Sequence, residues 1–461
     1  MKNASRKIRL INVVTLLVLL TISLSAQSKR DRDRAKNLQD QADRAFLAKS
    51  YQEAADKYAQ AISIVATNPY AHYRKGFAHF NLKQNTEALN EFAIALSQGF
   101  RPLEIYRVRA YIYYEQKDYD NALQDIRAAL VLAPRDITLL KALGEVQLSR
   151  NAFPEALDAF QRAAKVAPND AEVDYYLSRV YFGTGDVKEQ ERTATSALAK
   201  GTRFVGETHY FLGDARQKQR NSIGAIDAYQ KAINAKPDLY QAYRNLAEAY
   251  RSEGRYADAI AISKQGLRNF PNDGNIYTDL SWYYSLSDKP EDAIQAAKAG
   301  ITLLPSQYMA YTNLCRAYND TKQYDLAITS CNAALKLQPG DGETYFYLAR
   351  AYNLSGKTVE ATRLYGLAVK GLEDYVSKLP DYSDGWYLLG NAYFSDNQRD
   401  KAIAAYTKCL ELSPKFVKAM YNLGLVYVRK KNRIGANEQY NRLAPLDARL
   451  ATALKAEIDR M

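Results

Sequence analysis

The sequence is poor in the residue types that most often bind metals or carry out catalysis. Its 461 residues include only 3 His and 3 Cys. His72 and His79 lie seven residues apart, but no further ligand nearby completes the set that a transition metal needs. The segment GTG at 183–185 follows no strand pattern, so it is not a phosphate-binding loop. We therefore predict no catalytic residue, no metal and no cofactor, and we expect that the protein is not an enzyme.

Glycine and proline are also scarce, at 22 and 13 residues, which excludes a collagen-like or low-complexity chain. The formal net charge is +12, yet no block of consecutive Lys and Arg occurs of the kind that follows a phosphate backbone. Nucleic acid is therefore not an expected partner. The mildly basic balance instead favours acidic proteins or surfaces.

Long apolar runs are absent after residue 24. Before it, four basic residues precede an uncharged, mostly apolar run at 10–24 and the small residues Ser25 and Ala26. This layout predicts a signal peptide over residues 1–26, because the run is too short to cross a membrane comfortably; a retained N-terminal anchor is the alternative. We expect an exported protein of the bacterial periplasm or cell envelope. Residues 27–34 form a charged linker.

What the sequence does contain is one pattern written many times. KDYDNALQDIRAALVLAP at 117–134 returns as KQYDLAITSCNAALKLQP at 322–339. Aligning the shared alanine along the chain defines twelve units of about 34 residues, and such a period indicates a stacked repeat. The units cover 35–445 and start at residues 35, 69, 103, 137, 171, 206, 240, 274, 308, 342, 383 and 417.

Each unit has the spacing of two helices. In YTNLCRAY, Tyr311, Leu314, Cys315 and Tyr318 fall on one helical face. The eighth position of every unit is small, which lets two helices approach closely. Tyrosine recurs at the eleventh position, which explains much of the unusual total of 37. The chain is therefore predicted to be all-α.

The segment WYLLGNAY at 386–393, followed by Ala402, Tyr406 and Pro414, resembles the tetratricopeptide repeat. The resemblance extends from residue 35 to about 450. It implies a right-handed superhelical solenoid of about twelve helix-turn-helix repeats, with a concave groove lined by the first helix of each pair. It also implies binding of protein or peptide partners in that groove.

The units depart from the pattern in three places. Seven extra residues precede the eleventh unit, around EDYVSKLPDYSD, and would lengthen a helix by about two turns. The fifth unit is the weakest, with Gln190 in place of alanine, which suggests a bend or a softer junction. After the array, residues 446–461 are predicted to form a capping helix whose apolar face carries Leu446, Leu450, Leu454 and Ile458.

Aromatic and arginine side chains are predicted on the groove-facing positions that the resemblance implies. The candidates for partner binding are Tyr73, Phe77, Tyr111, Arg179, Arg244, Arg251, Trp282, Arg316 and Arg350. Such residues dominate binding energies, and arginine pairs with carboxylates, so acidic partners are favoured. The alternative is that these side chains pack against neighbouring repeats. The carboxylate clamp of the Hsp70/Hsp90 type is not expected, because no unit carries its Lys/Asn pair.

The cysteines occupy core positions of the repeats. Cys315 and Cys331 belong to the two helices of one unit, and an exported chain meets oxidising conditions. Two small buried thiols are the favoured interpretation, and a disulfide is the alternative.

The function predicted from these features is a scaffold or adaptor of the cell envelope. A chaperone-like binder of exported or unfolded proteins is the second hypothesis. A third is an accessory subunit of an envelope polysaccharide or secretion complex.

Overall fold

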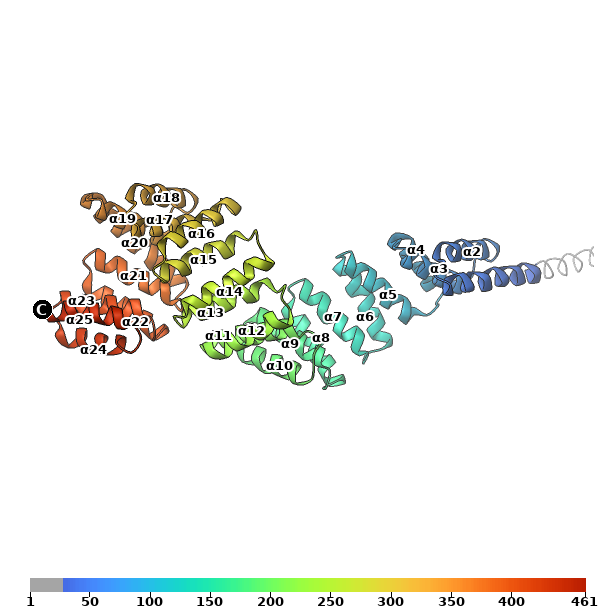
Figure 1. The fold of residues 1–461 in the computed structure, drawn as a ribbon. Coiled ribbons are helices and arrows are strands. Elements are labelled where there is room, and N and C mark those ends of the chain that lie inside the picture. Colours follow the sequence, from blue (N-terminus) through green and yellow to red (C-terminus); the bar gives the residue numbers. More distant parts are fainter. Residues whose placement is uncertain (1–27) are drawn as a thin grey trace, which may run out of the picture. The chain divides into compact units, whose positions relative to one another are not determined.

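The computed structural model describes residues 28–461. These residues fold into two compact units, and the chain passes from the first to the second between Thr184 and Gly185. The described residues form helices and no strand, as the sequence predicts (Figure 1). Within this part of the chain, no helix combines the length and apolar character needed to cross a bilayer. The predicted signal peptide at 1–26 lies outside the described residues.

The N-terminal unit is a series of antiparallel helix pairs. Its helices are a first helix at 28–47, α2 (Tyr51–Ile64), α3 (Pro69–Asn81), α4 (Asn85–Ser97), α5 (Pro102–Glu115), α6 (Tyr119–Leu132), α7 (Ile137–Ser149), α8 (Phe153–Val166) and α9 (Ala171–Thr184). Residues 28–34, expected as a charged linker, are already helical, so the first helix begins before residue 35.

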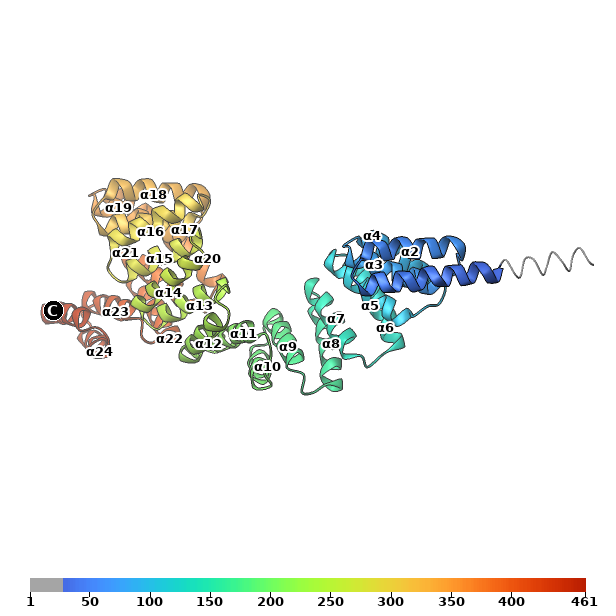
Figure 2. The same cartoon turned by 45° about the vertical axis from the view of Figure 1, so that its right-hand side comes forward.

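The C-terminal unit continues with the same arrangement (Figure 2). Its helices are α10 (Val187–Ala199), α11 (Val205–Lys218), α12 (Ser222–Ala235), α13 (Tyr240–Ser252), α14 (Tyr256–Asn269), α15 (Gly274–Leu286), α16 (Pro290–Leu303), α17 (Tyr308–Asp320), α18 (Tyr324–Leu337), α19 (Gly342–Leu354), α20 (Thr358–Lys378), α21 (Ser383–Ser395), α22 (Arg399–Leu412), α23 (Val417–Arg429), α24 (Arg433–Leu443) and α25 (Ala448–Asp459). The boundary between the two units falls inside the fifth repeat, where the sequence pattern is weakest.

In four repeats the eighth position is glycine and an aromatic ring from the partner helix occupies the space beside it. A Cβ added to Gly144 of α7 would lie 2.4 Å from the ring of Phe160 in α8. The same relation joins Gly390 to Tyr406, at 2.6 Å. A larger side chain would overpack the pair, at a cost of about 1–3 kcal/mol. The small residue and the ring, sixteen positions apart, thus set the close packing of these helix pairs.

The turn inside every repeat has a common backbone conformation. The fifteenth residue of each predicted unit has a positive φ, from Lys49 to Lys431. Only three of these residues are glycine, at 185, 254 and 356. In the third repeat, Lys117 (φ 60°) donates its amide to Tyr114 and the following amide bonds back to Tyr113, which caps the end of α5. The repeats therefore end their first helices in the same way, although the sequence rarely supplies the favoured residue.

The last helix, α25, covers the end of the array. Ala451, Leu454 and Ile458 are buried on it, and Leu454 fills the space beside Gly424 of α23. Leu446, expected on this face, precedes the helix and is 44% exposed. The prediction of a capping helix is confirmed, but its buried face begins one turn later than expected.

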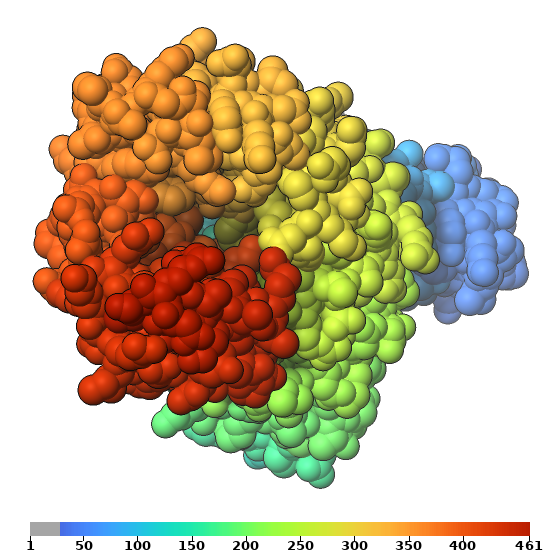
Figure 3. Space-filling model, turned by 60° about the vertical axis from the view of Figure 1, so that its left-hand side comes forward, coloured from blue at the N-terminus to red at the C-terminus, as the bar shows by residue number. Residues whose placement is uncertain are grey.

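The C-terminal unit winds back on itself, so that repeats far apart in sequence meet. Ion pairs join Arg220 to Asp381 at 3.4 Å, Lys415 to Glu253 at 3.2 Å and Arg449 to Asp288 at 2.6 Å. The partners are 161 or 162 residues apart in sequence. The space-filling view shows the unit surrounding a central hollow (Figure 3).

Candidate functional site

A cavity of about 320 Å³ lies inside the C-terminal unit. The first helices of consecutive repeats, α15, α17, α19 and α21, contribute to its lining, together with the end of α20. The chemically distinctive lining residues are the aromatics Trp282, Tyr283, Tyr308, Tyr375 and Tyr382 and the acidic residues Glu248, Asp279, Asp341, Glu343, Asp374 and Asp384. Aromatic walls with a few convergent polar groups are typical of ligand pockets.

The seven-residue insertion forms one wall of this cavity. Helix α20 has 21 residues, whereas α18 has 14, so the predicted lengthening of a second helix is confirmed. Its additional residues 372–378 include Asp374, Tyr375 and Lys378, which line the cavity. The lengthened second helix therefore places side chains that a standard repeat cannot supply.

Backbone contact between α19 and α20 brings this wall close to the neighbouring helix. A Cβ added to Gly371 would lie 2.7 Å from the Cα of Gly342 and 2.7 Å from the carbonyl oxygen of Gly340. All three glycines line the cavity. Glycine is required here because any side chain would separate the two backbones.

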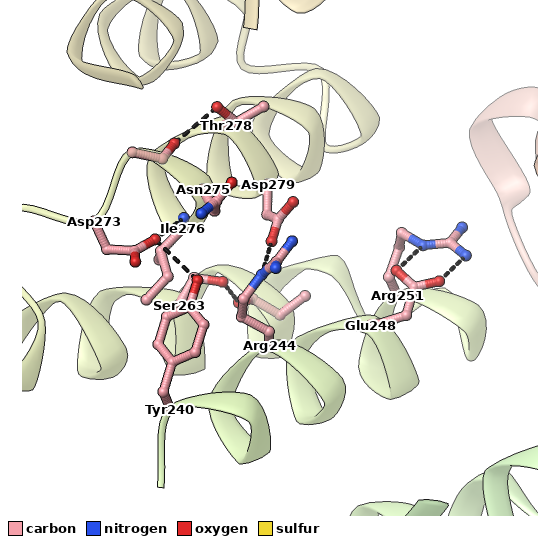
Figure 4. Close-up of polar contacts among 12 residues, drawn as sticks. Tyr240, Arg244, Glu248, Arg251, Ser263, Asp273, Asn275, Ile276, Thr278 and Asp279 are labelled. Atoms are coloured by element: carbon pink, nitrogen blue, oxygen red, sulfur yellow. Dashed lines mark hydrogen bonds and ion pairs between the residues drawn. The ribbon is translucent and has the colours of Figure 1, made fainter. Parts of the chain in front are cut away.

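A buried ion pair beside the cavity joins α13 to α21. The Nη1 of Arg251 lies 2.8 Å from the Oδ2 of Asp384, and their side chains are only 5% and 2% exposed. Arg251 also donates from Nε to Glu248 at 2.7 Å. Figure 4 shows Arg251 beside Glu248 on α13. One guanidinium thus serves two carboxylates from opposite sides of the unit.

The carboxyl groups at the cavity are held in an environment that disfavours their charge. Burial raises the pKa of Glu343 to about 7, although Arg316 opposes this shift. Asp341 and Asp384 add to the shift because their charges repel that of Glu343. Burial also raises the pKa of Asp341 and of Asp384. Burial therefore favours the neutral form of each of these carboxyl groups.

Four of the five arginines predicted to bind a partner are already paired within the chain: Arg244, Arg251, Arg316 and Arg350. Arg244 donates to Asp279 at 2.7 Å, as Figure 4 shows, and Arg350 lies 3.1 Å from Asp320. Arg251 forms the buried pair described above.

Arg316 is only 4% exposed and lies between two aromatic rings. Its guanidinium carbon is 3.5 Å from the ring centroid of Trp282 and 4.6 Å from that of Tyr347, and it pairs with Glu343. Its charge is therefore neutralised within the chain, as are the charges of Arg244, Arg251 and Arg350.

The remaining predicted residues lie in the N-terminal unit, outside the cavity. Tyr73 and Phe77 are half-buried, with ring centroids 5.0 Å apart. Tyr111 is 52% exposed, and Arg179 is also exposed. The structure thus brings Trp282 to the cavity, with Arg244, Arg251 and Arg316 bound to its acidic lining, and leaves these four elsewhere.

The sequence did not lead us to predict five of the lining residues: Tyr308, Tyr375, Tyr382, Asp341 and Glu343. The insertion is a signal that could have identified two of them, because Tyr375 and Tyr382 lie in or just after its extra residues. Asp341 and Glu343 carried no such signal, since they resemble ordinary residues at the start of a helix.

The cysteines and His72 are buried in the helix packing. A disulfide joins Cys315 of α17 to Cys331 of α18, in place of the two free thiols that the sequence favoured, and Cys409 is free and buried. His72 is buried, and its Nδ1 lies 2.6 Å from Glu91. Among residues 28–461, no group of three or more His, Cys, Asp or Glu side chains is arranged to hold a metal ion.

Comparison with known families agrees with the repeat pattern. A family model described as "Tetratricopeptide repeat" matches residues 73–137, 141–202, 210–274 and 283–342, which together exceed half of the chain. A second model, described as "TPR repeat", matches residues 380–431.

Individual relatives match over shorter lengths or with low similarity. Anaphase-promoting complex subunit 7 from Arabidopsis thaliana is 28% identical over 99 residues, which span 20% of this chain and 17% of that protein. The crystal structure of MamA protein is 25% identical, covering 38% of this chain and 94% of its own, with a TM-score of 0.33. Yeast Tom70 is 14% identical, covering 93% and 96%, with a TM-score of 0.40. On the evidence of the repeat models, the chain belongs to the tetratricopeptide repeat family, whose repeats form scaffolds for protein–protein interactions.

Proposed function

We propose that the chain is a non-enzymatic scaffold that holds a protein partner through a segment inserted into the cavity of the C-terminal unit. The observation that carries this proposal is the cavity itself. It combines five aromatic residues with convergent polar groups, and its wall is built by the insertion that departs from the repeat. Aromatic residues in recessed surfaces contribute strongly to protein recognition.

The electrostatics change the type of partner that we propose. The sequence favoured acidic partners because of its arginines, but Arg244, Arg316 and Arg350 are paired with carboxylates of this chain. An acidic segment would have to displace those carboxylates. The cavity supports a partner segment that is neutral or basic.

We place this scaffold outside the cytoplasm, in the bacterial cell envelope. Two features support the placement: the basic and apolar layout of residues 1–26, and the disulfide between Cys315 and Cys331. Disulfides persist in oxidising compartments and are rare in the cytosol of most organisms. Fractionation of cells, with N-terminal sequencing of the recovered protein, tests it; an uncleaved cytosolic protein would refute it.

The partner-binding role is tested by photo-crosslinking in intact cells. A photoreactive phenylalanine replaces Met309, which lines the cavity and is 46% exposed. The matched control replaces Val359, which is 82% exposed and does not line the cavity. We expect one dominant partner at 309 and not at 359. Equal capture at both positions would refute the assignment of the cavity.

The same experiment separates an adaptor from a chaperone-like binder. An adaptor should yield one partner in constant proportion, whereas a binder of exported or unfolded chains should yield many. Co-purification of polysaccharide with the crosslinked product would favour the accessory role in an envelope complex.

A further inference from the structure

The lining of the cavity contains more acidic groups than its cations can neutralise. Six carboxylates line it, and Lys378 is the lining residue with a positive charge. Three arginines approach from behind: Arg244 pairs with Asp279, Arg316 pairs with Glu343, and Arg251 is shared by two carboxylates. Lys378 pairs with Asp374 at 2.7 Å. Every nearby cation is therefore already engaged.

Asp384 shares its cation, Arg251, with a second lining carboxylate, Glu248. It is 2% exposed and lines the cavity, yet neither of its side-chain oxygens accepts a hydrogen bond of normal geometry in the described structure. Its contact with Arg251 is an ion pair at 2.8 Å without hydrogen-bond alignment. Because one guanidinium serves both Asp384 and Glu248, this part of the lining carries more carboxylates than cations.

Asp341 lines the cavity without a paired cation in the described structure. Its Oδ2 accepts hydrogen bonds from the backbone amide, at 2.8 Å, and the hydroxyl of Thr344 at the start of α19. Within the described residues, no ion pair involves Asp341. Burial raises its pKa, and the hydrogen bonds from Thr344 oppose this shift.

The aromatic lining suits the stem and the charge of a basic side chain. Tyr308 and Tyr375 are half-buried, and the rings of Tyr375 and Tyr382 have centroids 6.2 Å apart. Charges of Asp341 and Glu343 act on both Tyr308 and Tyr375, which places these rings and carboxylates together. Aromatic faces attract cations, and this attraction grows when water is excluded.

We infer that the cavity binds a cationic side chain, arginine or lysine, supplied by the partner segment. The charged group would approach Asp341 and Glu343, while the methylene stem lies along the tyrosines. A cavity of about 320 Å³ is large enough for one such side chain with adjoining backbone. This inference rests on the proposed function and specifies the chemistry that the cavity recognises.

The test compares two peptides that differ only in charge. An acetylated and amidated heptapeptide with a central arginine, flanked by Gly, Ser and Ala, is titrated into the full chain by calorimetry with its disulfide intact. The control peptide carries citrulline, which has nearly the same shape and no charge. We expect the arginine peptide to bind roughly tenfold more tightly or better. Equal affinities, or no binding of either peptide at millimolar concentration, would overturn the inference.

A matched pair of variants locates the effect. Asp341→Asn removes the charge but keeps a residue that caps a helix well. Asp273→Asn makes the same change at the N-cap of α15, at a position that does not line the cavity. We expect Asp341→Asn to weaken binding of the arginine peptide several-fold, with little effect on the citrulline peptide. Loss of affinity in Asp273→Asn alone would overturn the inference.

The outcomes distinguish this inference from the proposed function. If crosslinking at Met309 captures a partner while both peptides bind equally, the scaffold role stands and the cation preference falls. If the arginine peptide binds selectively but no partner is captured at Met309, the cation site stands and the partner-binding role of the cavity falls.

Discussion

The ion pair between Arg251 and Asp384 is expected to hold the C-terminal unit closed. Both side chains are at most 5% exposed, and the pair joins helices more than 130 residues apart in sequence. We predict that Arg251→Met opens this contact, because Asp384 and Glu248 lose their shared cation. Removing one partner of a buried pair typically costs about 3–5 kcal/mol. Replacing Asp384 by Leu in the same chain should recover part of this loss.

A surface pair in the same unit provides the control. Arg220 and Asp381 also connect distant repeats, but their side chains are 61% and 87% exposed. Solvent screens such pairs, so Arg220→Met should cost less than about 1 kcal/mol. The two variants remove the same charge and differ chiefly in burial.

The assay should report local opening, because repeat arrays do not unfold as a single cooperative unit. Hydrogen exchange of amides in α13 and α21 measures it directly. For amides that exchange through this opening at equilibrium, a loss of about 3–5 kcal/mol corresponds to exchange roughly 100- to 5,000-fold faster. Unchanged exchange in Arg251→Met, or equal effects in the two variants, would refute the reasoning.

A distance measurement checks the same prediction independently. Spin labels can be attached to cysteines introduced at Ala261 on α14 and Thr407 on α22, which are both exposed. The native free thiol, Cys409, is buried and should react slowly. We expect a longer and broader distance distribution in Arg251→Met than in the parent or in Arg220→Met.

Three further predictions concern the packing, the disulfide and the titration of the cavity. Gly371→Ala should lower stability by about 1–3 kcal/mol, because its Cβ would lie 2.7 Å from backbone at the start of α19. Gly366→Ala on the same helix meets no atom within 4 Å and should raise stability by up to about 1 kcal/mol; thermal melting compares the two. Alkylation of the denatured protein should modify one cysteine without reductant and three with it, and reduction of Cys315–Cys331 should cost about 3 kcal/mol in chemical unfolding. The pKa of Glu343 is about 7 in the fold against 4.5 as the ordinary value, so the folded state binds its proton more tightly. Its contribution to stability is therefore greatest below pH 4.5 and falls by about 3 kcal/mol in total as the pH rises through 7. Glu343→Gln should flatten this part of the stability profile, and an unchanged profile would contradict the assignment.

The repeat pattern could be predicted because its causes are local. A small residue recurs at one position of each helix pair, and in several pairs an aromatic ring follows sixteen positions later, as with Gly144 and Phe160. From residue 69 onward, the predicted unit starts fall within one residue of the helix starts, for example Tyr240, Tyr308 and Val417. Contacts over such short separations recur in every unit, so the period exposes them.

The site was only partly predictable, for two physical reasons. The sequence places Arg244, Arg251 and Arg316 on the inner helices, but their partners could not be identified from the spacing. Arg316 pairs across one repeat boundary, whereas Arg251 pairs with Asp384 across most of the unit. A charge that looks available for a ligand in the sequence can therefore be neutralised by a residue that only the winding of the solenoid brings near.

By itself, the sequence determined the helix pairs, their register, the lengthened helix before the eleventh repeat and the cap at the C-terminus. Each depends on residues within about one repeat of each other, where apolar spacing and side-chain size decide the packing. The tertiary structure alone decided that α13 meets α21, that the cavity is acidic and that its arginines are already paired. Those features depend on the accumulated rotation of successive repeats, a sum of small packing angles that no single unit of the sequence specifies.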